Sequence, residues 1–463
     1  MIRIFSRYWA VPAVLSLLVE GFVLSVAIPL ATQLRLGIGP GEPPYPDLVL
    51  MESVGFVAVG LLALYATGLY DFGERLSNRQ LYIGLLRAFF LAAVALWALY
   101  FLFPTMMTGR GVFAIALVFS FLCLFGWRYL LRWMLRGDGF AERVLIVGTD
   151  EKAIDVARET LARKHLGYRV VGFLDDDPKL QGVSLLNPRV IGTTNQCREL
   201  AVANGVTRVV VATLDYRGRV SMDSLLECKT SGIRVQEASS YYEQLTGKIM
   251  VEGLRKSWLI FSDGFVVARG TLFAKRLLDI VAATAGLLLA LPLMVLVAMA
   301  VRLDSPGPIF FRQDRVGRGN REFTLWKFRS MRTDAESQGA RWAVQGDPRI
   351  TRVGRFIRKT RLDELPQLWN VLVGDMSLVG PRPERRMFVD QLTAQNPFYE
   401  QRLVVRPGLT GWAQVKAPYA STFEESIEKL KYDLYYIKNM SLLLDISILL
   451  STARIVLLGR GAR

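Results

Sequence analysis

Four apolar stretches, each close to the length of a membrane-spanning helix, open this chain of 463 residues. They run over residues 9–32, 48–70, 81–103 and 112–134. A helix needs about 20 apolar residues to cross the hydrocarbon of a bilayer. The first stretch is too long for a cleavable signal peptide, and a second apolar stretch follows it. The sequence therefore predicts a four-helix transmembrane bundle within residues 1–137.

Basic residues in the connecting segments predict how this bundle is oriented. Arginines lie before the first stretch, between the second and third, and at the end of the fourth: Arg3, Arg7, Arg75, Arg79, Arg128, Arg132 and Arg136. The other two loops carry only Arg35 and Arg110. Because loops rich in Lys and Arg stay in the cytoplasm, both ends of the bundle are expected on the cytoplasmic side.

The charge balance indicates anionic partners, and the residue composition limits the groups available for catalysis. The chain has 57 Lys and Arg against 41 Asp and Glu, and from Leu272 onward 29 basic residues face 18 acidic ones. This excess of positive charge suits an anionic lipid surface or phosphorylated substrates. The membrane segments argue against nucleic acid as the partner. With one histidine and three scattered cysteines, a His-based metal site and a disulfide framework are excluded. Catalysis must use carboxylates, hydroxyls, Lys or Arg.

A Rossmann-like α/β domain is expected over residues 141–264. Strand-like runs alternate with helical runs at 143–148, 152–164, 168–174, 195–204 and 208–212, a pattern typical of a parallel sheet. The nucleotide fingerprint is degenerate, since only Gly148 of its three glycines is present. Asp150 and Glu151 also lie where a pyrophosphate would need a bare helix N-terminus. Regulation, ligand sensing or oligomerisation is therefore favoured over cofactor catalysis, and Asp175-Asp176-Asp177 is expected to be a solvated loop.

A fifth apolar stretch, residues 277–301, is long enough to cross a membrane. Pro292 lies near its middle, where it removes a backbone hydrogen bond and kinks a helix. Lys275 and Arg276 precede the stretch and Arg302 follows it. Basic groups at both ends and a kink favour a re-entrant helix that enters one leaflet and returns, over a helix that crosses.

Two adjacent carboxylates, Asp363 and Glu364, are the best candidates for catalysis. Leu365, Leu368 and Leu372 recur at helical spacing, and Gly374 is expected to end the helix. Pro366 is tolerated only in a first turn, so the pair lies near the helix N-terminus, where backbone N–H groups attract phosphate. One carboxylate can attack phosphorus while the other holds a metal. Taken alone, the pair favours the other interpretation, an acidic turn that merely balances the helix dipole.

The surroundings of the two acids favour phosphoryl transfer. Arg358, Lys359 and Arg361 lie just upstream, and Arg382 lies between two prolines that limit its backbone freedom. Arginine forks match phosphate oxygens in pairs, and positioning with charge neutralisation does most of the work in phosphoryl transfer. Many of the other arginines are expected to form a basic surface facing the membrane.

Several ordered motifs from residue 271 onward carry a family resemblance. They are Lys-Phe-Arg-Ser-Met at 327–331, Leu-Asp-Glu-Leu at 362–365, Asn-Val-Leu-Val-Gly-Asp-Met-Ser at 370–377, Gly-Pro-Arg-Pro at 380–383 and Arg-Pro-Gly-Leu-Thr-Gly-Trp-Ala-Gln-Val at 406–415. With these motifs, residues 271–463 resemble the bacterial sugar transferases, the monotopic polyprenyl-phosphate phosphoglycosyl transferases. The whole layout resembles their large subgroup, the undecaprenyl-phosphate glucose or galactose phosphotransferases, in which four spans and a Rossmann-like domain precede the catalytic unit.

The resemblance implies a two-step reaction. Asp363 would attack the β-phosphate of a UDP-sugar and release UMP, and the aspartyl phosphosugar would then pass sugar-1-phosphate to undecaprenyl phosphate. This is the initiating step of exopolysaccharide, capsule or O-antigen synthesis. Glu364 would hold Mg²⁺. Phosphate would be bound by Arg382, with three further candidates, Arg358, Lys327 and Arg329.

The resemblance also completes the expected architecture: a helical membrane bundle, a Rossmann-like α/β domain, and an α-rich mixed catalytic domain with a re-entrant membrane helix. The family's re-entrant helix often breaks at Ser-Pro. Here the pair is Leu291-Pro292, so the kink depends on Pro292 alone. Because UDP-sugars are cytosolic, the protein is expected as a multi-pass protein of the bacterial inner membrane with its soluble domains in the cytoplasm. Residues 440–458 are expected to form an interfacial helix.

Two other functions stay open at this point. An NAD-dependent sugar-nucleotide dehydratase can share the front of the chain, but it needs the glycine fingerprint and usually Tyr-x-x-x-Lys, which does not occur here. A membrane scaffold or regulator of polysaccharide assembly would not need the two acids or Arg382. The sequence does not identify the sugar or the polysaccharide pathway, and it leaves the oligomeric state open, a homodimer included.

Overall fold

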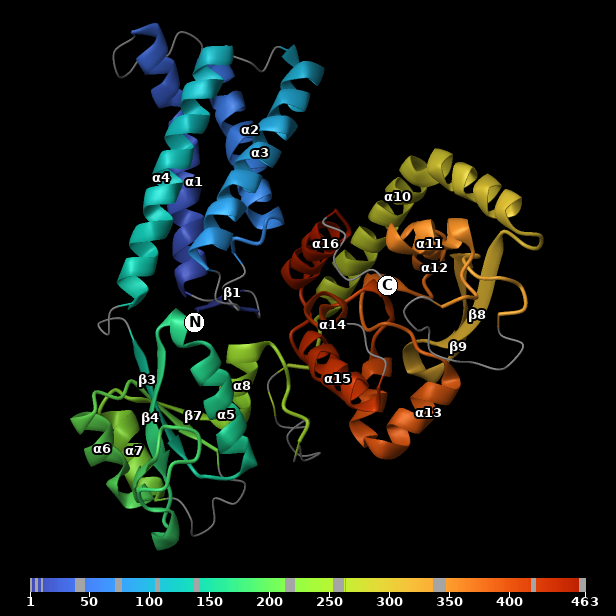
Figure 1. Cartoon of the computed structure of the whole chain (residues 1–463). Helices are drawn as coiled ribbons and strands as arrows, with labels where there is room; N and C mark the ends of the chain where they lie inside the picture. Colours follow the sequence, from blue (N-terminus) through green and yellow to red (C-terminus); the bar gives the residue numbers. More distant parts are fainter. Residues whose placement is uncertain are drawn as a thin grey trace. The chain divides into compact units, whose positions relative to one another are not determined.

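The computed structural model describes residues 2–4, 7–9, 11–37, 46–70, 77–104, 109–136, 141–212, 221–252, 262, 264–335, 347–417 and 422–457. Apart from short N-terminal pieces, the chain forms two compact units, Tyr8–Thr246 and Gly247–Arg463. The first unit contains a helical bundle and a parallel sheet (Figure 1). The second unit contains the sequence motifs of residues 327–415.

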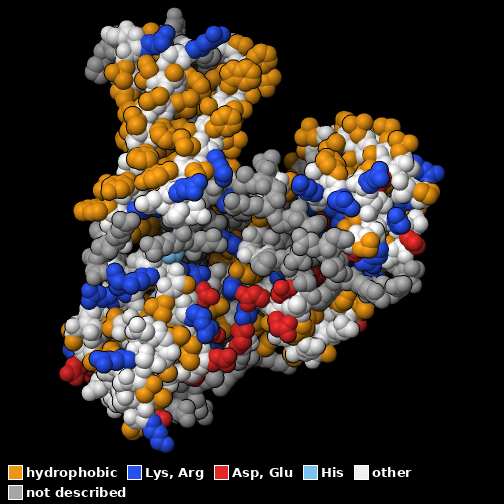
Figure 2. Space-filling model, viewed as in Figure 1, with side chains coloured by type: hydrophobic (Ala, Val, Ile, Leu, Met, Phe, Trp, Pro, Cys, Tyr) orange, Lys and Arg blue, Asp and Glu red, His pale blue; other side chains and the backbone are white. Residues whose placement is uncertain are grey.

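The helical bundle of the first unit confirms the four apolar helices predicted from the sequence. They are α1 (Val11–Leu36), α2 (Pro46–Ala66), α3 (Asn78–Leu102) and α4 (Arg110–Arg136). Figure 2 shows hydrophobic side chains over the outer faces of these helices and Lys or Arg toward their ends. Within the described residues, five helices are long and apolar enough to cross a membrane, these four and α10 (Arg269–Asp304) of the second unit.

Glu20, one of the buried acids of the bundle, is paired with an arginine. Glu20 of α1 meets Arg128 of α4 at 2.6 Å and accepts a hydrogen bond from the Tyr70 hydroxyl at 2.5 Å. Arg128 also donates to the carbonyl of Leu69 at 2.8 Å. A charge inside a membrane segment is costly unless it has such partners, so this cluster joins the helices.

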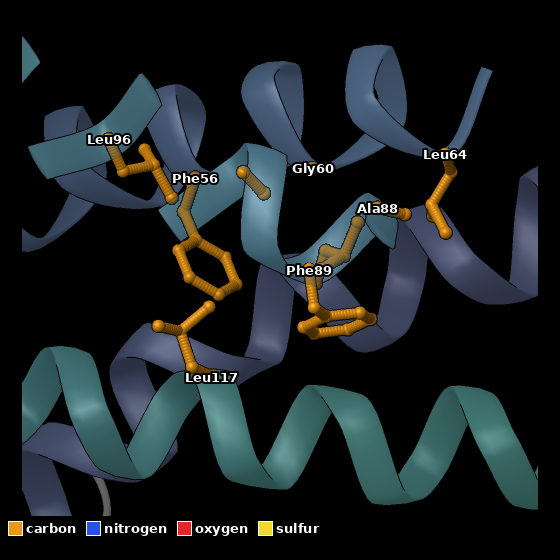
Figure 3. A pocket seen from close by; sticks show the side chains of 9 residues that line it. Phe56, Gly60, Leu64, Ala88, Phe89, Leu96 and Leu117 are labelled. Atoms are coloured by element: carbon orange, nitrogen blue, oxygen red, sulfur yellow. The ribbon is translucent and has the colours of Figure 1, made fainter. Parts of the chain in front are cut away.

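A small pocket between the helices of the bundle is entirely apolar (Figure 3). Its lining residues are Leu24, Phe56, Gly60, Leu64, Ala88, Phe89, Ala92, Leu96 and Leu117. At Gly60 an added Cβ would lie 3.0 Å from Leu24, so the small residue permits close approach of α1 and α2. The pocket offers no polar group that could orient a phosphorylated substrate.

The sheet of the first unit confirms the predicted parallel α/β fold. It has the order β5-β4-β3-β6-β7, and all its strand pairs are parallel. The strands are β3 (Glu142–Val147), β4 (Tyr168–Leu174), β5 (Val190–Gly192), β6 (Arg208–Val211) and β7 (Arg234–Glu237). The described helices are α5 (Glu151–Ala162), α6 (Cys197–Ala203), α7 (Met222–Thr230) and α8 (Ala238–Thr246). Numbered along the domain, the strands run 3-2-1-4-5, which is the classic Rossmann order without its sixth strand and with the first strand central.

Acids at the carboxyl edge of this sheet are engaged in local hydrogen bonds. The Thr149 hydroxyl donates to Asp175 at 2.5 Å, and Asp176 accepts from the backbone N–H and the hydroxyl of Thr194, both at 2.8 Å. Asp177 accepts from the backbone N–H of Lys179. The acidic run thus stabilises turns where a dinucleotide fold would bind pyrophosphate.

The second unit is α-rich with two small sheets. Its long helix is α10 (Arg269–Asp304), followed by the antiparallel hairpin β8 (Phe310–Val316) and β9 (Glu322–Phe328). Then come α11 (Arg352–Lys359), the 3-10 turn η7 (Leu362–Glu364), α12 (Gln367–Val373), β10 (Ser377–Val379), α13 (Arg386–Gln395), η8 (Pro397–Val404), β11 (Gly408–Thr410), α14 (Trp412–Lys416), α15 (Phe423–Lys438) and α16 (Leu442–Leu457). Strands β10 and β11 pair in parallel. The core between these elements is built from Val371, Met376, Leu434, Tyr435 and Tyr436.

Helix α10 is continuous through Pro292 and bends along its length, as Figure 1 shows. A proline inside a helix is a common cause of such a bend. Near Pro292 the apolar side chains of α10 are exposed, and Leu289 is 83% exposed. Before Pro292, by contrast, polar side chains of α10 form hydrogen bonds with other elements of the second unit.

Lys275 and Arg276, which the sequence suggested as basic flanks of a membrane segment, bind inside the second unit. Lys275 donates to the carbonyl of Val379 at 2.9 Å and pairs with Asp445 of α16 at 2.8 Å. Arg276 donates to the last carbonyls of α12, including Val371 at 2.7 Å. The expectation that both are membrane-flanking charges is corrected, because their hydrogen bonds go to backbone carbonyls and a buried acid.

The second unit begins before α10. Ile249 is 1% exposed and lies in its core, and the backbone N–H of Ile249 donates to Lys431 of α15 at 3.0 Å. The indole N–H of Trp412 donates to the carbonyl of Gly247 at 2.9 Å. The sequence assigned this stretch to the Rossmann-like domain ending at residue 264, but its apolar side chains are buried against α15. A catalytic fragment therefore needs residues from Gly247 onward.

Candidate active site

The two acids predicted to be catalytic lie in the short turn η7 between α11 and α12. Arg361, just before them, has φ 61°, a left-handed conformation that is uncommon for a residue with a side chain. Its carbonyl accepts from the N–H of Glu364 at 3.2 Å. A non-glycine residue held in this conformation is often found at functional sites, and here it turns the chain directly into the acid pair.

Helix α12 follows the acids with the start and stop expected from the sequence. Pro366 precedes its first residue, and Gly374, with φ 105°, ends it by donating its N–H to the carbonyl of Asn370. The side chain of Asn370 accepts from the backbone N–H of Trp326 at 3.1 Å and donates to the backbone carbonyl of Thr324 at 2.8 Å. Because Trp326 and Thr324 belong to β9, these bonds place the next residue of that strand, Lys327, beside the acids.

Glu364 is surrounded by cations. Its Oε1 atom accepts from Lys327 at 3.0 Å and from Arg382 at 2.9 Å, and Arg361 lies 4.0 Å from its other oxygen. Only 13% of its side chain is exposed. Burial alone would raise the pKa of Glu364, but Lys327, Arg382 and Arg361 together hold this pKa far below its usual range. Glu364 is therefore expected to be ionised at neutral pH.

Asp363 has the opposite electrostatic character. It is 8% exposed, and burial raises the pKa of Asp363 above its ordinary value, with Glu364 adding to the rise. Lys327, Arg358 and Arg382 oppose the rise, which places all three cations within electrostatic reach. Two adjacent carboxylates with pKa values moved apart can take different roles, one as a basic nucleophile and one as a fixed anion.

The structure thus brings together five of the six predicted site side chains and leaves one apart. Arg329 points away from the acids, with only 5% of it exposed. Its guanidinium donates to the carbonyls of Ser305 at 2.6 Å and Pro306 at 2.8 Å. These bonds secure the chain after α10, and they use the donors that phosphate oxygens would need.

Close backbone packing explains two glycine motifs beside the site. Strands β10 and β11 pair so tightly that a Cβ at Gly380 or Gly408 would overlap backbone atoms of the facing segment. The N–H of Gly408 donates to the carbonyl of Pro381 at 2.8 Å. The motifs Gly-Pro-Arg-Pro and Arg-Pro-Gly are thereby joined, and the joint fixes the start of the loop that carries Arg382.

A buried pair that sequence reasoning missed lies behind this loop. Arg402 of η8 meets Asp433 of α15 at 3.0 Å, and Arg402 also donates to the carbonyl of Arg382 at 2.8 Å. Burial raises the pKa of Asp433 to about 6 while Arg402 opposes the rise, so the pair is ionised at neutral pH. The one signal in the sequence is an acid within the apolar and aromatic run Tyr432-Asp433-Leu434-Tyr435-Tyr436.

The donor set suits a cation only together with substrate. Among the described side chains there is no group of three or more His, Cys, Asp and Glu that could hold a metal ion. Mg²⁺, however, prefers one or two carboxylates plus substrate phosphates. Glu364, whose pKa is lowered by its cations, and its neighbour Asp363 fit this requirement.

Sequence comparison with known proteins supports the family resemblance of residues 271–463. A sequence model described as bacterial sugar transferase matches residues 270–459, and one described as CoA-binding domain matches residues 65–226. A UDP-N-acetylgalactosamine-undecaprenyl-phosphate N-acetylgalactosaminephosphotransferase of Aeromonas hydrophila is 47% identical over 52% of this chain and 56% of its own length.

Two UDP-glucose:undecaprenyl-phosphate glucose-1-phosphate transferases match longer parts of the chain. The protein of Escherichia coli K12 is 36% identical over 69% of this chain and 68% of its own length. That of Xanthomonas campestris pv. campestris is 32% identical over 97% of this chain and 95% of its own length. With the motifs, the acid pair and a relative matched almost from end to end, the chain belongs to the bacterial sugar transferase family.

Proposed function

We propose that this protein transfers sugar-1-phosphate from a UDP-sugar to undecaprenyl phosphate, the first step in building a bacterial polysaccharide. The observation that carries the proposal is the largely buried pair Asp363 and Glu364, with Lys327 and Arg382 at 3.0 and 2.9 Å from Glu364. These cations lower the pKa of Glu364, whereas burial raises the pKa of Asp363. This arrangement combines a nucleophile with charge neutralisation, as phosphoryl transfer requires. The relatives are named as transferases, and no observation favours the scaffold or the dehydratase.

In the first step an oxygen of Asp363 attacks the β-phosphorus of the UDP-sugar. The bond from this phosphorus to the oxygen that bridges the two phosphates breaks, and UMP leaves with the electron pair. In the second step a phosphate oxygen of undecaprenyl phosphate attacks the same phosphorus, and the bond to Asp363 breaks. The Asp363 carboxylate is regenerated, so each half-reaction balances without an oxidant or a reductant.

The surrounding residues divide the remaining work. Arg382 and Lys327 bind phosphate oxygens, and because both contact Glu364 they are already aimed at one point. Arg358 adds positive potential on the side of Asp363. We propose that Glu364 is the protein ligand for Mg²⁺, which supplies charge neutralisation at the two phosphates when bound.

A panel of UDP-sugars tests this function directly. Full-length protein in detergent or nanodiscs is mixed with undecaprenyl phosphate and, separately, UDP-glucose, UDP-galactose, UDP-N-acetylglucosamine and UDP-N-acetylgalactosamine. We expect at least one sugar to give UMP and an equal amount of lipid-linked sugar diphosphate. Release of UDP instead of UMP, a modified nucleotide sugar, or no product with the whole panel would refute the proposal.

We further propose that α10 is a re-entrant helix and that both soluble parts lie in the cytoplasm of a bacterial inner-membrane protein. The bare apolar side chains around the bend at Pro292 suit a helix tip inside one leaflet. Lys275 and Arg276, near the start of α10, bind other elements of the second unit, which suits a helix that returns to the side from which it came.

Cysteine labelling tests this topology. Asp390 of α13 and Arg158 of α5 have side chains 64% and 63% exposed, so a cysteine at either position is accessible to a membrane-impermeant maleimide. With Cys123 replaced by Ala, the buried Cys197 and Cys228 should stay unlabelled and serve as the background. We expect Asp390→Cys and Arg158→Cys to react in inverted vesicles but not in intact spheroplasts. Labelling of Asp390→Cys from outside, in active protein, would show that α10 crosses the membrane.

A further inference from the structure

The loop that carries Arg382 is held through four consecutive carbonyl groups, each by a different donor. The carbonyls of Pro381, Arg382, Pro383 and Glu384 accept from the Gly408 N–H at 2.8 Å, Arg402 Nη2 at 2.8 Å, Arg315 Nη1 at 3.1 Å and the Val316 N–H at 2.9 Å, respectively. The two prolines have no N–H of their own, so carbonyls must carry most of the anchoring. Of the four carbonyls, that of Arg382 belongs to the residue whose side chain contacts Glu364.

The donor to the Arg382 carbonyl is a fully enclosed guanidinium. Arg402 is 7% exposed and Asp433, its partner at 3.0 Å, is 2% exposed. The hydroxyl of Tyr399 accepts from Nη1 of Arg402, and the guanidinium carbon of Arg402 lies 4.7 Å from the centre of the Tyr399 ring. Contacts from η8 and α15 thus constrain the guanidinium on several sides. A planar fork held in this way is well suited to fix one backbone carbonyl in space.

A continuous line of polar contacts then leads from the interior to the acid pair. Asp433 holds Arg402, Arg402 holds the main chain of Arg382, and the side chain of Arg382 reaches Glu364 at 2.9 Å. Phosphoryl transfer depends mainly on positioning, and misplacement by about 1 Å can cost about 100-fold in rate. A shift of the Arg382 carbonyl would move the guanidinium that faces both Glu364 and the transferred phosphate.

We infer that Arg402 and Asp433 are positioning residues of the transfer reaction, which fix Arg382 by holding its main-chain carbonyl without touching substrate. The inference rests on the proposed function and adds two residues to it. It differs from a purely structural role in one respect. The effect of the pair on the rate must pass through the Arg382 side chain.

A variant that replaces the pair without leaving a buried charge tests the first part of the inference. Arg402→Met, Asp433→Leu and Tyr399→Phe are combined, because apolar side chains of similar volume often replace a buried ion pair without loss of stability. We expect a thermal unfolding curve close to that of the wild type and a fall in UMP release of about 10- to 100-fold. A folded triple variant with activity within about twofold of the wild type would overturn the inference.

A double-mutant cycle tests whether the effect passes through Arg382. The triple substitution is repeated in an Arg382→Ala background, where it should reduce the remaining rate by no more than about twofold. Losses that multiply would show an independent structural role and overturn the inference. If the triple variant does not fold, Asp433→Asn, which keeps the side-chain shape, replaces it in the same cycle.

Two controls separate this result from a failure elsewhere. Glu428→Gln removes another acid of α15, one that pairs with Lys248 and Lys431 and makes no contact with the Arg382 loop in the described structure. We expect its activity to stay within about twofold of the wild type. Wild-type protein that is inactive with every UDP-sugar would refute the proposed function. Active wild-type protein with multiplicative losses would refute only the positioning role.

Discussion

Asp363→Asn is expected to lower the rate of UMP release by about 10³-fold or more, because it keeps the size of the side chain but removes the attacking anion. The measurement is the initial rate with saturating UDP-sugar and undecaprenyl phosphate. The matched control is Asp390→Asn, an acid whose side chain is 64% exposed on α13, which should stay within about twofold of the wild type. Near-normal turnover of Asp363→Asn would exclude covalent catalysis at this residue.

The pH profile of the wild type should show the same nucleophile. Burial raises the pKa of Asp363, and only the ionised form attacks, so activity is lost as the pH falls through this raised pKa. The acid limb of kcat/KM should therefore lie above the usual range of an aspartate. Lys327 opposes the rise, so Lys327→Met should move the limb to higher pH. A limb at the ordinary value in both proteins would contradict the buried nucleophile.

Glu364→Gln is expected to cause the second-largest loss, about 100-fold in the rate of UMP release. The change removes the anion that holds Lys327 and Arg382 at one point and removes the proposed Mg²⁺ ligand. The rate as a function of Mg²⁺ concentration should shift to higher concentrations in this variant. Excess EDTA should abolish wild-type turnover, and addition of Mg²⁺ should restore it. Full wild-type activity in EDTA would remove the metal from the mechanism.

The features predicted correctly from the sequence are those with a strong local signal. Apolar length identified the four helices of the bundle, and alternating apolar runs identified the central strands β3, β4 and β6. The start of α12 after the acids and its stop at Gly374 followed from proline and glycine chemistry. The edge strands β5 and β7 were missed, since one has only three residues and the other is partly exposed.

What the sequence could not predict are the long-range partners of charged side chains. Lys275 and Arg276 stand at the start of an apolar run like membrane-flanking residues, yet their partners are carbonyls about 100 residues later. Arg329 lies two residues after Lys327, but its donors turn to the end of α10 while Lys327 reaches Glu364. The acid Asp433 is 31 residues from Arg402. No spacing rule links such residues, because the tertiary fold alone brings them together.

The most direct test of the account is the mass of the intact protein after mixing with UDP-sugar in the absence of undecaprenyl phosphate. The two-step mechanism predicts one equivalent of UMP and a mass increase of one phosphosugar, which peptide mapping places on Asp363. Added undecaprenyl phosphate should then discharge the adduct as lipid-linked sugar diphosphate, and Asp363→Asn should show neither burst nor adduct. UMP that forms only when undecaprenyl phosphate is present, with no adduct in any rapidly quenched sample, would contradict the account and indicate direct transfer between the two substrates.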